Sequence, residues 1–201
     1  KSENFQISLW LVSLMSIILL MIIVGGLTRL TESGLSMVDW RLFMGTIPPL
    51  SHGDWLKVFE DYKQYPEYQI KNINMTLSEF KYIFWWEYGH RVLGRLIGII
   101  FIIPFIYFAL KKYFSNEELY SYSFLLFLGG TQGIIGWWMV KSGLDVNPYV
   151  SHLRLAVHLI IAQIILSLIA YLYLKRLDIG IYKNNFLSLI HISEPTRRGI
   201  I

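Results

Sequence analysis

Two histidines in separate apolar stretches are the residues of this chain best suited to chemistry. The first, His90, follows Glu87 by three residues, so both side chains lie on one face of a helix. Gly94 and Gly98 follow His90 at four and eight residues, on the same face. This leaves a strip of helix without side chains beside an imidazole, where a flat macrocycle could lie with its iron bound to His90.

The second histidine, His158, is expected at a matching depth in the last apolar stretch. It lies about 16 residues before the end of that stretch at Leu174, and His90 lies about 20 residues before the end of its own stretch at Leu110. At 1.5 Å per residue these positions are roughly 24 and 30 Å from the same surface. Two imidazoles on helices that run in parallel could then ligate one haem from both faces.

Other interpretations of these residues stay open at this point. The glycine strip could be a seam at which two helices pack closely, and each histidine alone could be a buried, hydrogen-bonded residue. A zinc or copper site would need more ligands than His90, His158 and Glu87 supply. His52, in a polar loop, and His152, on another helix face near a loop, are poor ligand candidates.

Three arginines flank the two histidines. Arg91 and Arg95 follow the first histidine, and Arg154 precedes the second by one turn. They could mark the membrane–water interface and extend to it, or pair with haem propionates, which suit the guanidinium group. Glu87 could pair with Arg91 four residues on, or act as a proton-handling carboxylate beside a substrate.

Long apolar blocks must position these residues. Hydrophobic residues make up 54% of the 201-residue chain, and they gather in blocks instead of alternating with polar residues. About 20 apolar residues cross a membrane as a helix, whose backbone groups bond internally. The sequence therefore predicts an all-α integral membrane protein with a four-helix transmembrane bundle. The expected spans are 7–27, 82–110, 119–140 and 153–174.

The distribution of positive charge predicts the orientation. Lys111 and Lys112 lie between the second and third spans, and Lys175 and Arg176 follow the fourth. Lysine and arginine in short connections favour the inner side, so the N-terminus is expected on the cytoplasmic or matrix side. The expected segments are a stub with span one (1–27), an extracytoplasmic loop (28–81), spans two to four (82–174), a cytoplasmic tail (175–186) and a last segment (187–201).

The last segment, 187–201, differs from the rest. Its letters LSLIHISEPTR, at 187–197, resemble the translation of a sequencing-library adapter, and they form neither a span nor a periodic helix. We therefore expect the authentic sequence to stop near Phe186, and His191 is not a ligand candidate.

Composition excludes several classes of site. The net charge is +4 without a basic run, so we expect no nucleic-acid partner. The chain has no cysteine, which excludes disulfides, iron–sulfur clusters and thiolate metal sites. Small residues in the third span predict a close helix-packing seam at Gly129, Gly133 and Gly136, with Gln132 beside it.

Several longer stretches together resemble haem A synthase, a family of membrane enzymes that convert haem O to haem A for cytochrome oxidase. The resemblance extends from about Gly25 to Leu174. Its strongest stretches are Gly25–Trp40 (GGLTRLTESGLSMVDW), Pro48-Pro49-Leu50 with Trp55, Asn74–Phe84 (NMTLSEFKYIF), Glu87-x-x-His90-Arg91, Leu128–Leu144 (LGGTQGIIGWWMVKSGL) and Arg154–Leu159 (RLAVHL).

The resemblance implies a protein of eight spans in two similar halves, of which this chain is the N-terminal half. His90 and His158 match the histidine pair that is taken to hold the substrate, haem O, and Glu87 matches an acidic residue three positions before the first histidine. The implied reaction oxidises a ring methyl to a formyl group through an alcohol, with oxygen from water or O2. The missing half would carry haem b, so the chain is expected to be a fragment unable to turn over.

The resemblance also implies a location and partners. Some bacterial members have a cysteine pair in the first outer loop, and its absence resembles the alphaproteobacterial and mitochondrial branch, so a bacterial or mitochondrial inner membrane is expected. The implied partners are membrane lipid and haem O, with haem O synthase, an electron carrier and a second copy of the chain. The alternative functions are a b-type cytochrome that only passes electrons and a non-haem scaffold or transporter.

Overall fold

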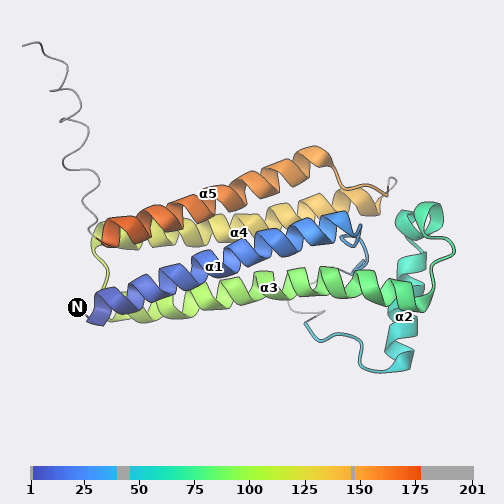
Figure 1. The fold of residues 1–201 in the computed structure, drawn as a ribbon, viewed down its shortest axis with the longest axis horizontal. Coiled ribbons are helices and arrows are strands. Elements are labelled where there is room, and N and C mark those ends of the chain that lie inside the picture. Colours follow the sequence, from blue (N-terminus) through green and yellow to red (C-terminus); the bar gives the residue numbers. More distant parts are fainter. Residues whose placement is uncertain (1, 40–45, 146–147, 178–201) are drawn as a thin grey trace, which may run out of the picture.

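Four long helices lie side by side and form one bundle in the computed structural model (Figure 1). The structure describes residues 2–39, 46–145 and 148–177, and within these ranges it contains no strand. Each of the four helices is long and apolar enough to cross a membrane. The predicted all-α integral membrane protein with four spans is therefore confirmed. The spans are α1 (Ser2–Leu30), α3 (Leu77–Leu110), α4 (Asn116–Leu144) and α5 (His152–Arg176).

The two helices that carry the histidines, α3 and α5, occupy opposite corners of the bundle. α1 packs against both of them, and α4 packs against α5 and, less extensively, against α3. Consecutive spans are antiparallel, so α3 and α5 run in the same direction. Side chains from α3 and α5 therefore enter the interior from opposite sides, with α1 and α4 between them.

Capping side chains determine where two of the spans begin. α3 starts at Leu77, earlier than the predicted start at 82, because Thr76 caps it. The Thr76 hydroxyl accepts a hydrogen bond from the Glu79 N–H at 3.3 Å, and the Glu79 carboxylate accepts one from the Thr76 N–H at 2.8 Å. A matching capping box starts α4. The outer end of α3 thus extends past its apolar part and supports the segment before it.

That segment is folded, whereas the sequence analysis treated it as a loop. It contains α2 (His52–Lys63) and a short π-helix, η1 (Glu67–Lys71). We call residues 46–76 the outer cap, and Figure 1 shows α2 lying across the outer end of α3. A second hydrophobic cluster joins the cap to α3. Its buried members are Met37, Trp55, Phe59, Tyr62, Phe80, Ile83 and Phe84.

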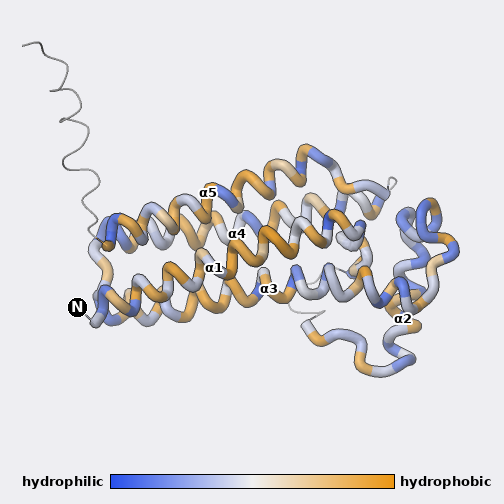
Figure 2. Tube along the Cα trace, in the orientation of Figure 1, coloured by the Kyte–Doolittle hydropathy of each residue, from blue (hydrophilic) through white to orange (hydrophobic). Residues whose placement is uncertain are grey.

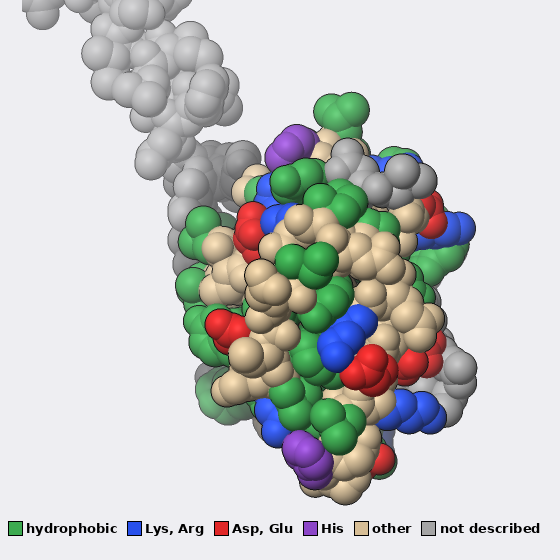
Figure 3. All heavy atoms as spheres, turned by 90° about the vertical axis from the view of Figure 1, so that its right-hand side faces the viewer, with side chains coloured by type: hydrophobic (Ala, Val, Ile, Leu, Met, Phe, Trp, Pro, Cys, Tyr) green, Lys and Arg blue, Asp and Glu red, His purple; other side chains and the backbone are tan. Residues whose placement is uncertain are grey.

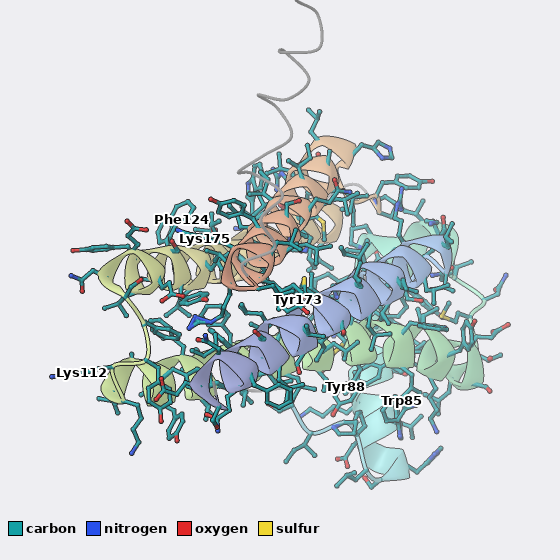
Figure 4. The ribbon with its side chains drawn as sticks, turned by 60° about the vertical axis from the view of Figure 1, so that its left-hand side comes forward. Trp85, Tyr88, Lys112, Phe124, Tyr173 and Lys175 are labelled. Atoms are coloured by element: carbon teal, nitrogen blue, oxygen red, sulfur yellow. The ribbon has the colours of Figure 1, made fainter. Side chains whose placement is uncertain are left out.

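Apolar and polar residues are also separated between the spans and the outer cap. Figure 2 shows apolar residues along all four spans and polar residues concentrated in the outer cap. Figure 3, which looks onto the cap end, shows acidic and basic side chains interspersed there. At the other end, where Figure 4 shows both Lys112 and Lys175, the ion pairs Lys175–Glu117 (3.3 Å) and Arg176–Glu118 (2.6 Å) join α5 to the start of α4.

The larger cluster of buried apolar side chains fills the half of the bundle that is remote from the cap, which we call the inner half. Trp10 lies at its centre, and ring centroids of Phe101, Phe108 and Tyr122 lie 5.3, 5.8 and 5.3 Å from its own. The Trp10 indole N–H donates to the Ile100 carbonyl at 2.9 Å. The buried members of this core are Ile7, Trp10, Leu11, Leu14, Ile18, Phe101, Phe108, Tyr122, Leu125, Ile165, Ile169 and Leu172.

A carboxyl group is buried in the outer cap. Glu67 is 3% exposed and accepts a hydrogen bond from the Tyr62 hydroxyl at 3.0 Å. The same hydroxyl accepts a hydrogen bond from the Asn72 amide at 2.8 Å. Burial raises the pKa of Glu67 from its ordinary value of 4.5 to about 7, although Tyr62 and Lys71 oppose the shift. The folded cap therefore favours the protonated form of this carboxyl.

We predict that the outer cap becomes less stable as the pH rises from 4.5 to about 7. Protonated Glu67 contributes its full stabilisation at pH values below its ordinary pKa, and this contribution disappears as the pH rises through the raised pKa. The free energy of unfolding of the cap then falls by about 3 kcal/mol. Glu67→Gln, which cannot ionise, should abolish this pH dependence, while exposed Glu60→Gln should retain it. Hydrogen exchange of residues 52–72, corrected for the intrinsic rate, measures the effect. Equal pH dependence in both variants would contradict the assignment.

Candidate functional site

Few residues of the four spans are buried in the outer half of the bundle, towards the cap. Among the described residues, the buried ones in this half of the spans, beyond the inner core, are Thr28, Phe80, Ile83, Phe84, Glu87 and Gly143. Phe80, Ile83 and Phe84 belong to the cluster that joins the cap to α3. A layer of partly buried residues closes the packed core below it, formed by Ile22, Ile97, Leu128 and Ile161. Both histidines lie within one turn or two on the outer side of this layer. The layer is therefore the floor of the candidate site.

His90 lies against a glycine of the neighbouring helix α1. A Cβ atom added to Gly25 would be 3.1 Å from the Nε2 atom of His90 and 3.4 Å from its Cδ2. Such distances are tighter than ordinary van der Waals contact, so the ring can occupy this place only beside a residue without a side chain. A Cβ on the next residue, Gly26, would meet nothing within 4 Å.

His158 has a corresponding glycine on α4. A Cβ atom added to Gly136 would be 3.2 Å from the Cε1 atom of the imidazole and 3.8 Å from its Nδ1. Gln132, one turn earlier on α4, donates its amide N–H to the backbone carbonyl of His158 at 2.8 Å. The imidazole thus lies on a face of α4 that a glycine leaves open and a glutamine borders.

The structure brings the two predicted ligands into one region. His90 and His158 are close enough across the bundle for a charge on one imidazole to disfavour a charge on the other. Neither ring makes a hydrogen bond within the described residues, and the Nδ1 atom of His158 is buried there without a partner. Buried imidazoles normally have hydrogen-bond partners. Two that lack them, each held in place by a glycine, fit the axial positions of a haem.

The predicted glycine strip on α3 is partly open. A Cβ atom on Gly98 would meet nothing within 4 Å, whereas one on Gly94 would lie 3.4 Å from the Cε atom of Met21. The predicted packing seam on α4 includes Gly136, which approaches His158, whereas a Cβ atom added to Gly129 or Gly133 would meet nothing within 4 Å among the described residues. A seam requires a second helix at the same face, and here the neighbouring helices pack elsewhere.

Glu87 holds the segment that follows α1. Its Oε2 atom accepts hydrogen bonds from the Ser36 hydroxyl at 2.7 Å and from the Met37 N–H at 2.7 Å, and it is 3% exposed. Its Oε1 atom pairs with Arg91, so the i,i+4 pair that the sequence allowed is present. Leu35, beside Ser36, packs against Gly143 of α4, where a Cβ would be only 2.7 Å from its Cδ1. Residues 33–37 therefore reach from α4 to α3.

Arg91 and Arg154, two of the three predicted arginines, bind backbone carbonyls at the outer end of the bundle. Arg91 also donates to the carbonyls of Met37 at 2.8 Å and Asp39 at 3.3 Å. Arg154 donates to the Trp138 carbonyl at 2.7 Å, and its guanidinium lies 4.4 Å from the centre of the Trp138 ring. These contacts fix both side chains at the outer end of the bundle. The third, Arg95, is half-buried one turn further into α3.

The remaining histidines lie away from this site. His52 and His152 are exposed, as their poor ranking as ligands predicted, and His191 lies outside the described residues. No group of three or more His, Cys, Asp or Glu side chains in the described ranges could hold a metal ion. Two axial imidazoles fit a haem, whose iron already has four ring nitrogens, better than they fit zinc or copper.

Three contacts of the site were not predicted. The sequence analysis did not pair Gly25 with His90 or Gly136 with His158, and it did not connect Glu87 to Ser36. Each contact joins different helices or a helix and a loop, so periodicity within one helix does not reveal it. The local signal was a glycine near the end of a predicted span, at a depth similar to that of a histidine.

The fold and the site define a class: a four-span membrane bundle with one histidine on each of two diagonal helices, both in its outer half. Comparison with known proteins then identifies the family. Residues 8–187 match the COX15-CtaA family model, described as cytochrome oxidase assembly protein. The chain belongs to this family.

Curated relatives carry the name heme A synthase. The chain is 51% identical over 158 residues to that of Bradyrhizobium diazoefficiens, covering 79% of this chain and 44% of the relative. It is 51% identical over 164 residues to that of Flavobacterium psychrophilum, covering 81% and 48%. For Nitrosospira multiformis the identity is 48% over 174 residues, covering 87% and 49%. The chain thus spans about half the length of these relatives. No solved structure matches it.

We predict that Gly25→Ala and Gly136→Ala both weaken haem binding, because each methyl group displaces an imidazole by a few tenths of an ångström. Extra methyl groups in tight sites cost about 1–3 kcal/mol. Gly26→Ala and Gly133→Ala are matched controls, since a Cβ at either position meets nothing within 4 Å. Titration with haem, followed by absorbance, measures affinity. Equal affinities in all four variants would contradict the role of the glycines.

Proposed function

We propose that this chain forms the haem O-binding half of a haem A synthase. The observation that supports it best is the pair of imidazoles, His90 and His158, that lack hydrogen-bond partners above an apolar floor. The names of the relatives agree with this proposal. The reaction is the oxidation of a ring methyl of haem O to the formyl group of haem A, through an alcohol.

In this proposal the substrate haem lies between α3 and α5. His90 and His158 bind the iron, which anchors the ring at a fixed depth. Gly98 leaves space along α3, while Gly25 and Gly136 leave room for one edge of each imidazole beside α1 and α4. The floor of Ile22, Ile97, Leu128 and Ile161 would contact the apolar edge of the ring. The bound porphyrin would replace the side-chain packing that the outer half lacks.

The propionates would point to the outer interface, where the arginines lie. Arg91 and Arg154 keep their present partners and offer their remaining N–H groups, and Arg95 approaches from one turn deeper on α3. A guanidinium has five N–H donors, so it can bind a protein carbonyl and a carboxylate together. Carboxylates placed at the interface also avoid the cost of burial in hydrocarbon.

Glu87 is the proposed catalytic carboxylate. It lies one turn from His90 on the same helix face, so it borders the same interior space. Ser36, Met37 and Arg91 hold its two oxygens in place. A fixed carboxylate beside the reacting methyl could accept the protons that leave during oxidation.

The whole protein and its surroundings are part of the proposal. The relatives are about twice as long as the matched region, and a second four-helix half with haem b would complete the enzyme. An electron carrier would remove electrons and haem O synthase would deliver the substrate, and the protein would form a homo-oligomer. The proposed location is a bacterial or mitochondrial inner membrane. Basic side chains at the inner end, such as Lys111 and Lys112, favour an orientation with the N-terminus on the cytoplasmic or matrix side.

The decisive experiment incubates membranes containing the full-length gene product with haem O and identifies the extracted haems. We expect hydroxylated haem and haem A to accumulate. His90→Ala and His158→Ala should lose the spectrum of bis-histidine haem in this half and the conversion with it. His152→Ala, an exposed histidine on the same helix as His158, should retain both.

The possible outcomes separate the candidate functions. Haem O that binds but is recovered unchanged would make the protein an electron carrier, and the enzyme proposal would fail. A spectrum unaffected by either histidine variant would mean that these imidazoles do not bind iron. The proposal for this half of the protein would then fail as well.

Glu87→Gln should retain haem O but lower its conversion by about 100-fold or more, the range of a lost general base. Because Glu87 also anchors Ser36, the matched control is Ser36→Ala, which removes one anchoring hydrogen bond and leaves the carboxylate. We expect that control to lower conversion only slightly. Equal losses in both variants would assign the effect to the position of residues 33–37 and not to proton transfer. Haem absorbance and product analysis measure the two quantities separately.

A further inference from the structure

One side chain beside the His158 ring uses only half of its hydrogen-bonding capacity. Gln132 of α4 donates its amide N–H to the His158 carbonyl at 2.8 Å. This bond fixes the orientation of the amide, since a flipped amide would place its oxygen against the carbonyl oxygen. The Oε1 atom of Gln132 therefore points away from the His158 carbonyl. It is buried and has no hydrogen-bond partner within the part of the chain that the structure describes.

The imidazole of His158 has a buried atom of complementary kind. Its Nδ1 atom also has no hydrogen-bond partner among the described residues. Gly136 marks the direction in which this edge of the ring points, because a Cβ there would approach the Cε1 and Nδ1 atoms but not Nε2. Gly136 and Gln132 are one turn apart on the same face of α4. The unpaired nitrogen and the unpaired oxygen thus lie along one strip of one helix interface.

We propose that Gln132 is a positioning residue for His158, whose Nδ1–H donates a hydrogen bond to the Gln132 amide oxygen when Nε2 binds the iron of haem O. The inference rests on the proposed function, because it treats His158 as an axial ligand. A neutral imidazole with a protonated Nδ1 is a donor at that atom, and an amide oxygen is an acceptor. Forming this bond satisfies both buried atoms in a region where lipid supplies no water.

This hydrogen bond has a consequence for the iron. An acceptor on the outer nitrogen of a ligating imidazole fixes the ring orientation and makes the ligand more basic. A more basic ligand stabilises ferric over ferrous iron, which lowers the reduction potential. His90 has no hydrogen-bonding side chain at its ring within the described residues. Gln132 would therefore tune the substrate iron from the side of His158 alone.

The test compares three variants of the full-length protein loaded with haem O. Gln132→Met keeps the length of the side chain and removes the acceptor, so we expect a higher reduction potential and about 10- to 100-fold weaker haem binding. Gln132→Glu keeps an acceptor oxygen in either protonation state, so its potential should remain at or below that of the parent. Gln163→Met, on an exposed face of α5, should match the parent.

Redox titration and electron paramagnetic resonance of the ferric low-spin haem measure these effects without turnover. If Gln132→Met does not fold, Gln132→Asn replaces it, because the shorter amide cannot reach the ring and should also raise the potential. Equal potentials in the parent, the Met or Asn variant and the Glu variant would overturn the role of Gln132. Failure of the proposed function would give a different result, because His158→Ala would then leave the haem spectrum unchanged.

Discussion

Helices in a membrane associate mainly through close packing, because lipid tails are as apolar as the side chains they would replace. In this bundle the close packing is concentrated in the inner half, around Trp10 and the aromatic rings of α3 and α4. The ion pairs of Lys175 and Arg176 with the start of α4 reinforce the same end. Because the helices are packed together at the inner end, the outer half can be stable with few buried side chains. The space around the two histidines therefore depends on packing two or more turns away from it.

Different helices of this arrangement supply different parts of the site. α3 and α5 stand at opposite corners and supply His90 and His158, while α1 and α4 stand between them and supply the glycines against which the rings lie. A side chain on Gly25 or Gly136 would push an imidazole away from its place. The two bracing helices thus determine where the ligands point, although they carry no ligand themselves. On α4, Gln132 also positions His158 by a hydrogen bond to its backbone carbonyl.

Much of this arrangement was predictable from local patterns. Block length revealed the four spans, and spacing within a single helix revealed the Glu87–Arg91 pair. α2 was missed although Trp55, Phe59 and Tyr62 repeat at helical spacing after the Ser51–Asp54 capping box, because the segment's polarity suggested a loop. The contacts of Gly25, Gly136 and Ser36 depend on the rotation of one helix relative to another. A single sequence contains no direct signal for that rotation, which also determines that a Cβ on Gly129 or Gly133 would meet no other described residue.

The buried carboxylate of Glu87 positions residues 33–37, the segment that covers the site. Residues 33–37 leave the end of α1, place Leu35 against Gly143 of α4 and bring Ser36 and Met37 to Glu87 of α3. A buried carboxylate requires hydrogen bonds and a counter-ion, and here the backbone N–H of Met37, the Ser36 hydroxyl and Arg91 supply them. Because the same residue lies one turn from His90, any displacement of Glu87 would move the segment over the outer opening together with the wall beside the imidazole. The catalytic role proposed for Glu87 and its structural role thus require the same fixed position, and only variants that separate charge from anchoring can distinguish them.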